Sequence, residues 1–193
     1  MTGNGRRDFL RAGVALLAID CLTGGRSRAA DSRGAPAPSA SGAEVVIEKF
    51  STAGKSEGTA HVSKVTKSEA EWRAQLSPLA FQVARQAGTE SPFSGEYDKN
   101  HAAGLYLCVC CGTALYDSRT KFDSGTGWPS FYRVISRHNV GEGRDWSLGM
   151  LRDAVSCTRC DAHLGHVFDD GPKPTGLRYC MNSVSLRFLP YSA

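Results

Sequence analysis

Two cysteine pairs of the form Cys-x-x-Cys place the strongest constraint on how this chain can fold. Cys108 and Cys111 form one pair, and Cys157 and Cys160 form the other. Two thiolates at this spacing can bind one tetrahedral metal ion from a tight turn, and a second pair completes a closed set of four sulfur ligands. The fold must then bring two distant turns together. We predict one structural zinc ion per chain, although iron would accept the same ligands.

Other uses of these cysteines stay open from the residues alone. The four cysteines could instead form two disulfides, which an exported protein permits. A thioredoxin-like redox motif would explain one pair and leave the other unexplained. Cys110 is a spare thiol inside the first pair and could replace Cys108 or Cys111 as a ligand.

The N-terminus has the layout of a removable export signal rather than of a folded segment. Arg6-Arg7 precedes a short apolar stretch, Val14 to Ile19, and small residues follow at Ala29-Ala30. The stretch is too short to cross a bilayer, which takes about 20 apolar residues. We predict a twin-arginine signal over 1–30, export to the periplasm and no stable membrane span. A basic disordered N-terminus, or a lipid anchor at Cys21, are the alternatives.

Residues 31–64 are predicted to be a largely disordered linker. Ser, Arg, Ala, Gly and Pro dominate its first part. Its one run of consecutive apolar residues, Val45 to Ile47, could form an isolated strand or dock on the domain.

The catalytic domain is expected over 65–190. The chain of 193 residues has a formal net charge of +4. Its Lys and Arg residues are scattered, so we expect no nucleic-acid partner.

The domain is predicted to begin with two short helices and continue as a mostly β fold. A capping box at Ser68 to Glu71 opens a helix that presents Trp72 and Leu76 on one face. A second helix is expected from Pro78 to Gln86, ended by Gly88. Beyond Gly95, short apolar runs separated by Gly, Asp and Pro indicate antiparallel strands. Alternating polar and apolar residues predict one half-buried strand over 178–188.

Cys180 belongs to neither cysteine pair and is the candidate nucleophile. On a strand it shares a face with Arg178 and Asn182, because residues two apart point the same way. Arg178 favours the thiolate by its charge, and the thiolate is the nucleophilic form. Asn182 offers a donor and an acceptor. A half-buried structural cysteine is the alternative, but this polar face is a poor core.

Two further segments have the composition of a site. His163 and His166 supply two imidazoles near the second cysteine pair and are candidate acids. They could also be structural histidines or ligands of a second metal. Trp128 lies in a glycine-rich loop that would present its indole, although ordinary core packing would explain it too.

Together these segments resemble the methionine sulfoxide reductase B family, the R-specific methionine sulfoxide reductases. The resemblance extends over about Ser68 to Pro190, essentially the whole predicted domain. The matching segments, in the family's order, are Glu71-Trp72, Thr89 to Tyr97, Cys108 to Cys111, Gly127 to Phe131, Cys157 to Cys160, His163 to Pro172 and Arg178 to Ser183.

The resemblance implies two antiparallel sheets, the β-tent, with short N-terminal helices. It implies that Cys180 attacks the sulfoxide sulfur and becomes a sulfenic acid as methionine leaves. It also implies zinc at the cysteine pairs, away from the active site, as in the family's zinc-bearing branch. The implied site residues are His163, His166, Arg178 and Asn182 around the reacting atoms, and Trp128 and Phe131 as substrate-binding residues.

Two positions depart from the family pattern. Many members carry a resolving cysteine where this chain has Thr126. We therefore expect a thioredoxin-like or other external thiol to reduce Cys180. The family often reads Arg-Thr-Glu-Val where this chain has Arg152 to Val155, so Ala154 replaces the usual acid and Asp153 points to the other face of a strand. A histidine would then be oriented less firmly and activity would be lower.

Two other functions compete with the reductase. A zinc-ribbon binding module would explain the four cysteines but neither Cys180 nor the histidines. A thiol–disulfide oxidoreductase would need a Cys-x-x-Cys pair free of metal. Under the reductase interpretation, the substrate is oxidised methionine in exported proteins.

Overall fold

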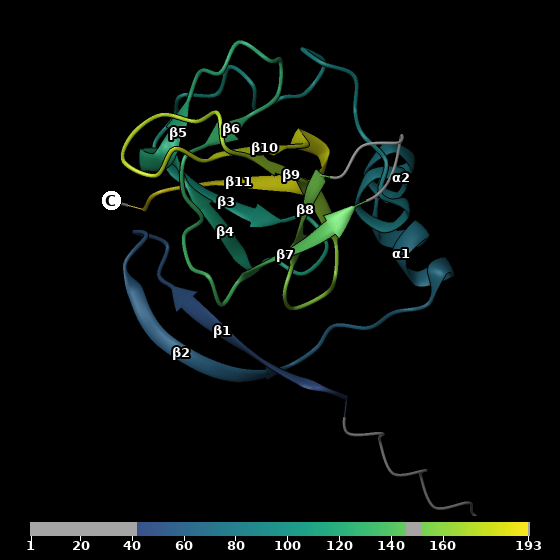
Figure 1. Cartoon of the computed structure of the whole chain (residues 1–193). Helices are drawn as coiled ribbons and strands as arrows, with labels where there is room; N and C mark the ends of the chain where they lie inside the picture. The colour runs from purple at the N-terminus through teal and green to yellow at the C-terminus, as the bar shows by residue number, and fades with distance from the viewer. Residues whose placement is uncertain (1–41, 146–151, 193) are drawn as a thin grey trace, which may run out of the picture. The chain divides into compact units, whose positions relative to one another are not determined.

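The computed structural model describes residues 42–145 and 152–192 (Figure 1). This part of the chain is built mainly from short antiparallel strands, with two short helices. The mostly β, antiparallel fold predicted from the sequence is confirmed. The described residues contain three sheets, however, where two were expected.

The strands are distributed over a hairpin, a three-stranded sheet and a six-stranded sheet. The hairpin pairs β1 (Glu44–Phe50) with β2 (Ser56–Ser63). The three-stranded sheet has the order β11 (Leu186–Pro190), β3 (Gly104–Cys108), β4 (Ala114–Asp117). The six-stranded sheet has the order β5 (Lys121–Phe122), β6 (Ser130–Phe131), β10 (Arg178–Met181), β9 (His163–Phe168), β8 (Arg152–Cys157), β7 (Val140–Asp145). Two 3₁₀ turns, η1 (Ser118–Thr120) and η3 (Ser183–Ser185), join strands of different sheets.

An aromatic cluster forms the core between the two larger sheets. Tyr106 and Tyr116 come from the three-stranded sheet, and Phe131 and Tyr179 from the six-stranded sheet. The rings of Tyr116 and Phe131 are stacked with centroids 4.4 Å apart, and Tyr106 meets Phe131 edge-on at 5.0 Å. The Tyr116 hydroxyl donates to the Met181 sulfur at 3.0 Å. Aromatic packing of this kind adds to the burial of apolar area in holding the sheets together.

The two helices begin where the sequence predicts them. Helix α1 (Glu69–Gln75) has a complete capping box at Ser68, and α2 (Pro78–Gln86) begins at the predicted proline. The predicted C-terminal signal is shifted by one residue, because Ala87 and not Gly88 has the positive φ, 52°. Gly88 follows in a tight space, since a Cβ there would lie 3.0 Å from the carbonyl oxygen of Gln82.

The prediction of a disordered linker over 31–64 is wrong for residues 44–63, which form the hairpin. Only one side chain of the hairpin, Ile47, is buried, so the hairpin sequence has only a weak apolar pattern. The hairpin is held instead by the fully buried Asn139. The Asn139 amide oxygen accepts from the Glu48 N–H at 2.7 Å, and its amide nitrogen donates to the carbonyls of Glu48 and Ala114, both at 2.8 Å. This side chain pairs with β1 as a neighbouring strand would.

The N-terminal predictions lie outside the described residues. These are the export signal over 1–30, including Cys21, and the first part of the linker, 31–41. Within the described part of the chain, no helix is long and apolar enough to cross a membrane.

The predicted strand over 178–188 is in fact two strands in different sheets. β10 ends at Met181 and β11 begins at Leu186, with η3 between them. Ser183 and Ser185, expected to face solvent, are buried. The Ser185 hydroxyl donates to the His163 carbonyl at 3.0 Å, so the polar group is satisfied inside the fold. Polar and apolar residues do alternate in this segment, but the polar Ser183 and Ser185 are buried and do not face water.

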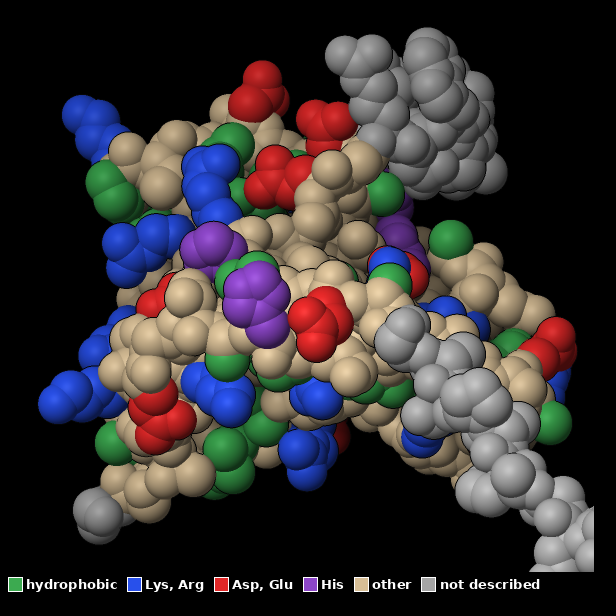
Figure 2. Space-filling model, turned by 90° about the horizontal axis from the view of Figure 1, so that it is seen from below, with side chains coloured by type: hydrophobic (Ala, Val, Ile, Leu, Met, Phe, Trp, Pro, Cys, Tyr) green, Lys and Arg blue, Asp and Glu red, His purple; other side chains and the backbone are tan. Residues whose placement is uncertain are grey.

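Surface charge agrees with the weak positive balance of the sequence. On the face shown in Figure 2, Lys and Arg side chains are interspersed with Asp and Glu. Hydrophobic side chains are scattered over this face and do not form a continuous area. No continuous stripe of Lys and Arg side chains is visible on this face of the described residues (Figure 2).

Candidate metal site and thiol pocket

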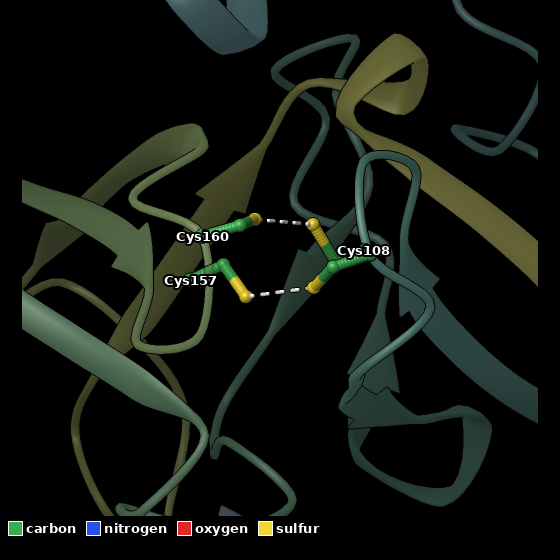
Figure 3. A group of neighbouring side chains, drawn as sticks. Cys108, Cys157 and Cys160 are labelled. Carbon is green, nitrogen blue, oxygen red and sulfur yellow. Dashed lines mark hydrogen bonds between the residues drawn. The ribbon is translucent and has the colours of Figure 1, made fainter. Parts of the chain in front are cut away.

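The four cysteines of the two pairs converge on one point (Figure 3). The sulfur atoms of Cys108, Cys111, Cys157 and Cys160 all lie within 4.8 Å of one another. The Cys108–Cys160 sulfur distance is 3.6 Å and the Cys111–Cys157 distance is 3.5 Å. Metal–sulfur bonds of about 2.3 Å give a sulfur tetrahedron with edges of about 3.8 Å. The four thiols therefore fit a tetrahedral ion such as zinc, and they leave no coordination position for a substrate.

Each pair sits in a turn at the end of a strand. Cys108 is the last residue of β3, and the following turn contains Gly112 at φ 75°, whose N–H donates to the Cys108 carbonyl at 2.8 Å. Cys157 is the last residue of β8, and Asp161 takes the corresponding positive φ, 55°. Its N–H donates to the Cys157 carbonyl at 2.9 Å. These two similar turns aim four sulfurs at one volume.

Side chains of the two helices hold both turns. The Gln75 side-chain amide of α1 donates to the Cys110 carbonyl, and Arg85 of α2 donates to the Cys160 carbonyl, each at 2.7 Å. Cys110 itself is buried beside the site but is not one of the four converging ligands. Of the two ligand choices that the sequence left open in the first pair, the geometry selects Cys108 and Cys111.

Cys180 lies in a separate small pocket on β10. The pocket has a volume of about 100 Å³, and Trp128, His166, Phe168 and Asn182 are among its lining residues. The Cys180 thiol is half-buried. The structure thus brings the predicted nucleophile together with one predicted histidine, the predicted asparagine and the predicted tryptophan.

Strand pairing explains why these side chains meet. Ala154, His166, Cys180 and Ser130 are opposite one another on β8, β9, β10 and β6, so they form one row across the sheet. Residues in such a row face the same side. Asp153 pairs with Val167 in the adjacent row, as expected from the alternation. The position beside His166 therefore holds the methyl group of Ala154 in place of an acid.

The same register places Phe131, the other predicted substrate-binding residue, outside the row that contains Cys180. Phe131 is opposite Tyr179 in the row next to Ser130 and Cys180, and successive residues of a strand face opposite sides. It is fully buried in the aromatic core and does not line the pocket. Phe131 supports the sheet from behind, and the surface that a substrate would meet belongs to its neighbours.

The second predicted histidine, His163, is buried next to the first. The ring centroids of His163 and His166 are 5.3 Å apart. The register between β8 and β9 shifts at Val155/Ser156, where Ser156 pairs with His163 after Val155 has paired with Gly165. This β-bulge gives β9 an extra residue, which changes the side-chain alternation between the two histidines. His166 lines the pocket, whereas His163 is not among its lining residues.

Arg178 shares the pocket face of β10 but its charge is largely engaged elsewhere. Its guanidinium makes a two-point ion pair with Asp170, with both N–O distances 2.8 Å, and stacks over the Phe168 ring. Burial is the main influence on the Cys180 thiol and raises its pKa above the ordinary value. The Thr126 hydroxyl, Arg178 and Ser130 lower the pKa but do not outweigh burial. Arg178 therefore lowers the pKa of Cys180, as expected, but by less than burial raises it.

A network of three hydroxyl groups reaches the thiol through Thr126. The Thr126 oxygen is 3.9 Å from the Cys180 sulfur. Ser124 hydrogen-bonds to both Thr126 and Ser130, at 2.8 and 2.7 Å. The position at which many family members carry a resolving cysteine thus lies directly against Cys180, occupied here by a hydroxyl.

Glu90 is a buried acidic residue to which no sequence motif assigned a role. Its N–H donates to the Asn182 side-chain oxygen at 2.9 Å, and its carbonyl accepts from the Trp128 indole at 3.2 Å. Its carboxylate accepts from the N–H groups of Ser183 and Val184 at 2.6 and 3.1 Å. One residue therefore orients two walls of the pocket. The only sequence signal was an acid between uncharged residues in the loop before Gly95.

A cavity larger than the thiol pocket lies elsewhere and contains none of the predicted site residues. It has a volume of about 330 Å³ and separates the hairpin from the three-stranded sheet. Its walls include Ile47, Phe50, Leu107 and Arg159. Cavity size alone therefore does not identify the candidate site, since the Cys180 thiol and the His166 imidazole line the smaller pocket.

Comparison with known proteins adds a family match. The SelR domain model matches residues 76–190. The peptide methionine sulfoxide reductase MsrB of Pseudomonas putida (strain W619) is 57% identical over 129 residues, which are 67% of this chain and 97% of that protein. The protein of the same name from Herminiimonas arsenicoxydans is 58% identical over 125 residues, 65% of this chain and 91% of that protein. The SelR match contains the metal site and the thiol pocket, and the hairpin precedes it.

Proposed function

The chain belongs to the SelR domain family, whose relatives include peptide methionine sulfoxide reductases MsrB, and we propose that it reduces the R epimer of methionine sulfoxide in oxidised polypeptides. The observation that carries this proposal is the Cys180 thiol in a pocket walled by an indole and an imidazole. A thiol is the nucleophile the reaction needs, and the pocket is large enough for a side chain. Reductases for the two epimers are separate enzymes, so selectivity for one epimer is expected.

The proposed reaction begins with the thiolate form of Cys180. Its sulfur attacks the sulfoxide sulfur, and the oxygen passes to Cys180, which becomes a sulfenic acid while the sulfoxide becomes a thioether. The sulfoxide oxygen leaves its sulfur only when it is protonated, so a proton donor is required. His166, next to Cys180 in the row of side chains, is placed to supply or relay that proton. The Trp128 indole would contact the methyl group and help to distinguish the epimers.

Regeneration of Cys180 is proposed to use an external thiol. Thr126 occupies the position of a resolving cysteine, and the other described cysteines are the four metal ligands and Cys110 beside them. Two thiols of a reductant would convert the sulfenic acid to a thiol, giving a disulfide and water. The sulfenic acid is the species that a thiol can attack.

We also propose that the bound metal is zinc, one ion per chain. The four thiols suit a soft or borderline cation in tetrahedral geometry. When bound, the ion would join the end of β3 to the end of β8 and so stabilise the fold. The residues that act on the substrate lie in a different pocket, so the ion takes no part in the reaction.

The remaining part of the proposal concerns where the enzyme works. Arg6-Arg7 ahead of a short apolar stretch supports export by the twin-arginine route, and the substrates would then be oxidised proteins of the periplasm. A reporter fused after residue 42 should appear in the periplasm, and replacing both arginines by lysine should keep it in the cytoplasm. Unchanged export of the lysine variant would contradict this route.

The main test is an epimer-resolved assay with the full-length protein. Separate R and S epimers of a blocked methionine sulfoxide are incubated with the enzyme and dithiothreitol. We expect only the R epimer to be reduced, and only when Cys180 is intact. Reduction of the S epimer, or none by a folded, metal-loaded protein, would overturn the proposal.

A single-turnover experiment tests the external thiol. Without reductant, mass spectrometry should find Cys180 as a sulfenic acid, trapped by dimedone, and no internal disulfide. Thr126→Cys is the matched positive control, because its sulfur would lie next to Cys180 and should form a disulfide in the same experiment. An obligatory internal disulfide in the unmodified protein would contradict this step.

A further inference from the structure

Phe93 is an exposed aromatic side chain in an unusual backbone conformation. It is 67% exposed, and the described residues contain one other exposed large hydrophobic side chain, Leu79 at 43%. Phe93 also has a φ of 62°, which bulky residues rarely adopt. A single exposed leucine on a helix needs no explanation. An exposed phenylalanine held in a left-handed conformation does, because such residues concentrate at functional sites.

The Phe93 ring is packed against the loop that carries the pocket tryptophan. The Phe93 N–H donates to the Gly127 carbonyl at 2.8 Å. Gly127 has a φ of 86°, and a Cβ there would lie 2.6 Å from the Phe93 nitrogen and 2.8 Å from its ring. Only glycine permits this approach. Phe93 is therefore fixed beside Gly127, which directly precedes Trp128.

The loop of Phe93 is also tied to the pocket at its other end. Three residues earlier, Glu90 binds the Asn182 side chain and the Trp128 indole through its own backbone. The segment from Ser91 to Ser94 between these anchors is exposed and carries no charge. Phe93 does not line the Cys180 pocket, but its anchors on both sides are residues next to or within the pocket wall, which places its exposed ring beside the pocket.

The size of the pocket indicates what would cover this ring. A volume of about 100 Å³ is well below the range of about 300–1,000 Å³ typical of sites that enclose a whole small ligand. It suits one side chain. If that side chain is an oxidised methionine in a polypeptide, the residues on either side of it must lie outside, across the rim.

We propose that Phe93 is a specificity-determining residue that contacts the amino acids flanking the oxidised methionine and favours apolar ones. This inference rests on the proposed function and extends it to a substrate class, an uncharged polypeptide segment with apolar residues next to the sulfoxide. An aromatic ring gives a large contact area at a small cost in conformational entropy, because it has only two side-chain torsions. Its fixed backbone lowers that cost further.

The test compares two peptides that differ only in the residues next to the sulfoxide. The full-length enzyme is assayed on the R epimers of acetyl-Leu-Met(O)-Leu-amide and acetyl-Ser-Met(O)-Ser-amide. We expect Phe93→Ala to lower the ratio of kcat/KM for the leucine peptide over the serine peptide by about tenfold, the lower end of what loss of an apolar contact causes. Phe93→Gly should do the same, and it tolerates the positive φ without strain. Phe93→Trp should keep the ratio.

Leu79→Ala is the matched control, since it removes an exposed apolar side chain of α2 that does not line the pocket. Its ratio should equal that of the unmodified enzyme. If the alanine and glycine variants lose activity equally on both peptides, Phe93 only supports the loop and the inference is wrong. An unchanged ratio would also overturn it. If the unmodified enzyme reduces neither peptide nor a blocked methionine sulfoxide, the proposed function itself fails.

Discussion

The molecule uses cysteine in two regions with opposite arrangements. In the metal site, four thiols lie in turns at strand ends and face one another. In the thiol pocket, Cys180 lies within strand β10 and faces an imidazole, an indole and hydroxyl groups. The first arrangement would saturate every sulfur with one metal ion, and the second leaves one sulfur beside a pocket.

The pKa values of these thiols show that proton affinity alone does not identify the nucleophile. Hydrogen bonds among the clustered sulfurs lower the pKa of Cys111 far below its ordinary value, while the pKa values of Cys108 and Cys160 are raised. Burial raises the pKa of Cys180. The more acidic thiol is enclosed by other sulfurs, while the less acidic one borders a cavity. Access for the substrate, more than acidity, separates the two roles.

The largest expected effect comes from removing the nucleophile. Cys180→Ser should lower kcat/KM for the R sulfoxide by at least about 10³-fold, since a serine hydroxyl is a much weaker nucleophile than a thiolate. The metal content should stay at one ion per chain and the melting temperature should change by no more than about 2 °C, less than the shift expected from 1 kcal/mol in a domain of this size. Steady-state kinetics, metal analysis and a thermal melt check these outcomes. A serine variant that stays active would remove Cys180 from the reaction.

Removing a metal ligand should instead change the metal content and the stability of the fold. Cys157→Ser should lose the ion and lower the melting temperature by about 10 °C or more, because metal binding contributes directly to folding. Cys110→Ser is the matched control and should keep both the ion and the stability, since Cys110 is not among the converging thiols. Loss of metal from the Cys110 variant instead would mean that the ligand set is different.

Glu90 sharpens the comparison because it acts on the pocket and not on the metal site. Glu90→Gln should weaken the hydrogen bonds to the buried Ser183 N–H and the partly buried Val184 N–H and lower the free energy of unfolding by about 1–3 kcal/mol. Because Glu90 orients Asn182 and Trp128, kcat/KM should also fall, by about tenfold. Denaturant unfolding and kinetics measure the two effects.

Glu69→Gln provides the control for that experiment. Glu69 pairs with Arg73 on the exposed surface of α1. Its loss should cost no more than about 0.5 kcal/mol and leave the metal content unchanged. Equal effects of the two substitutions would show that the burial of Glu90 has no special importance.

The smallest expected effect concerns pH. The Thr126 hydroxyl lowers the pKa of Cys180, so Thr126→Val should raise it and slow alkylation of Cys180 by iodoacetamide a few-fold at neutral pH. The alkylation rate should increase with pH in both proteins, and the increase should occur at higher pH in the valine variant. If the alkylation rate of the valine variant increased at lower pH instead, the Thr126 hydroxyl would not be lowering the pKa of Cys180.

The same pKa affects stability. The pKa of Cys180 in the folded protein lies above the unfolded value of about 8.5, so the thiol stabilises the fold below that pH and the contribution is lost as pH rises through the folded pKa.

Local patterns in the sequence predicted the elements that local interactions stabilise. The capping box at Ser68 and the proline at the start of α2 were found because their partners are within a few residues. The hairpin was missed because the partner of Glu48 is Asn139, 91 positions away, and one buried side chain leaves no periodic signal. The single strand predicted over 178–188 failed for a similar reason, since the distant carboxylate of Glu90 binds the backbone that separates β10 from β11.

The sequence by itself determined the chemistry: which cysteines form pairs, which one remains, and which family the motifs resemble. Residue type and spacing carry that information, because a thiolate or an imidazole has the same ligands and reactions wherever the chain places it. The tertiary structure decided which of those groups meet. Strand register put His166 and Ser130 beside Cys180 and turned Phe131 into the core, and a shift by one residue would have exchanged these faces. Register depends on packing between segments far apart in the chain, so it is written in no single stretch of the sequence.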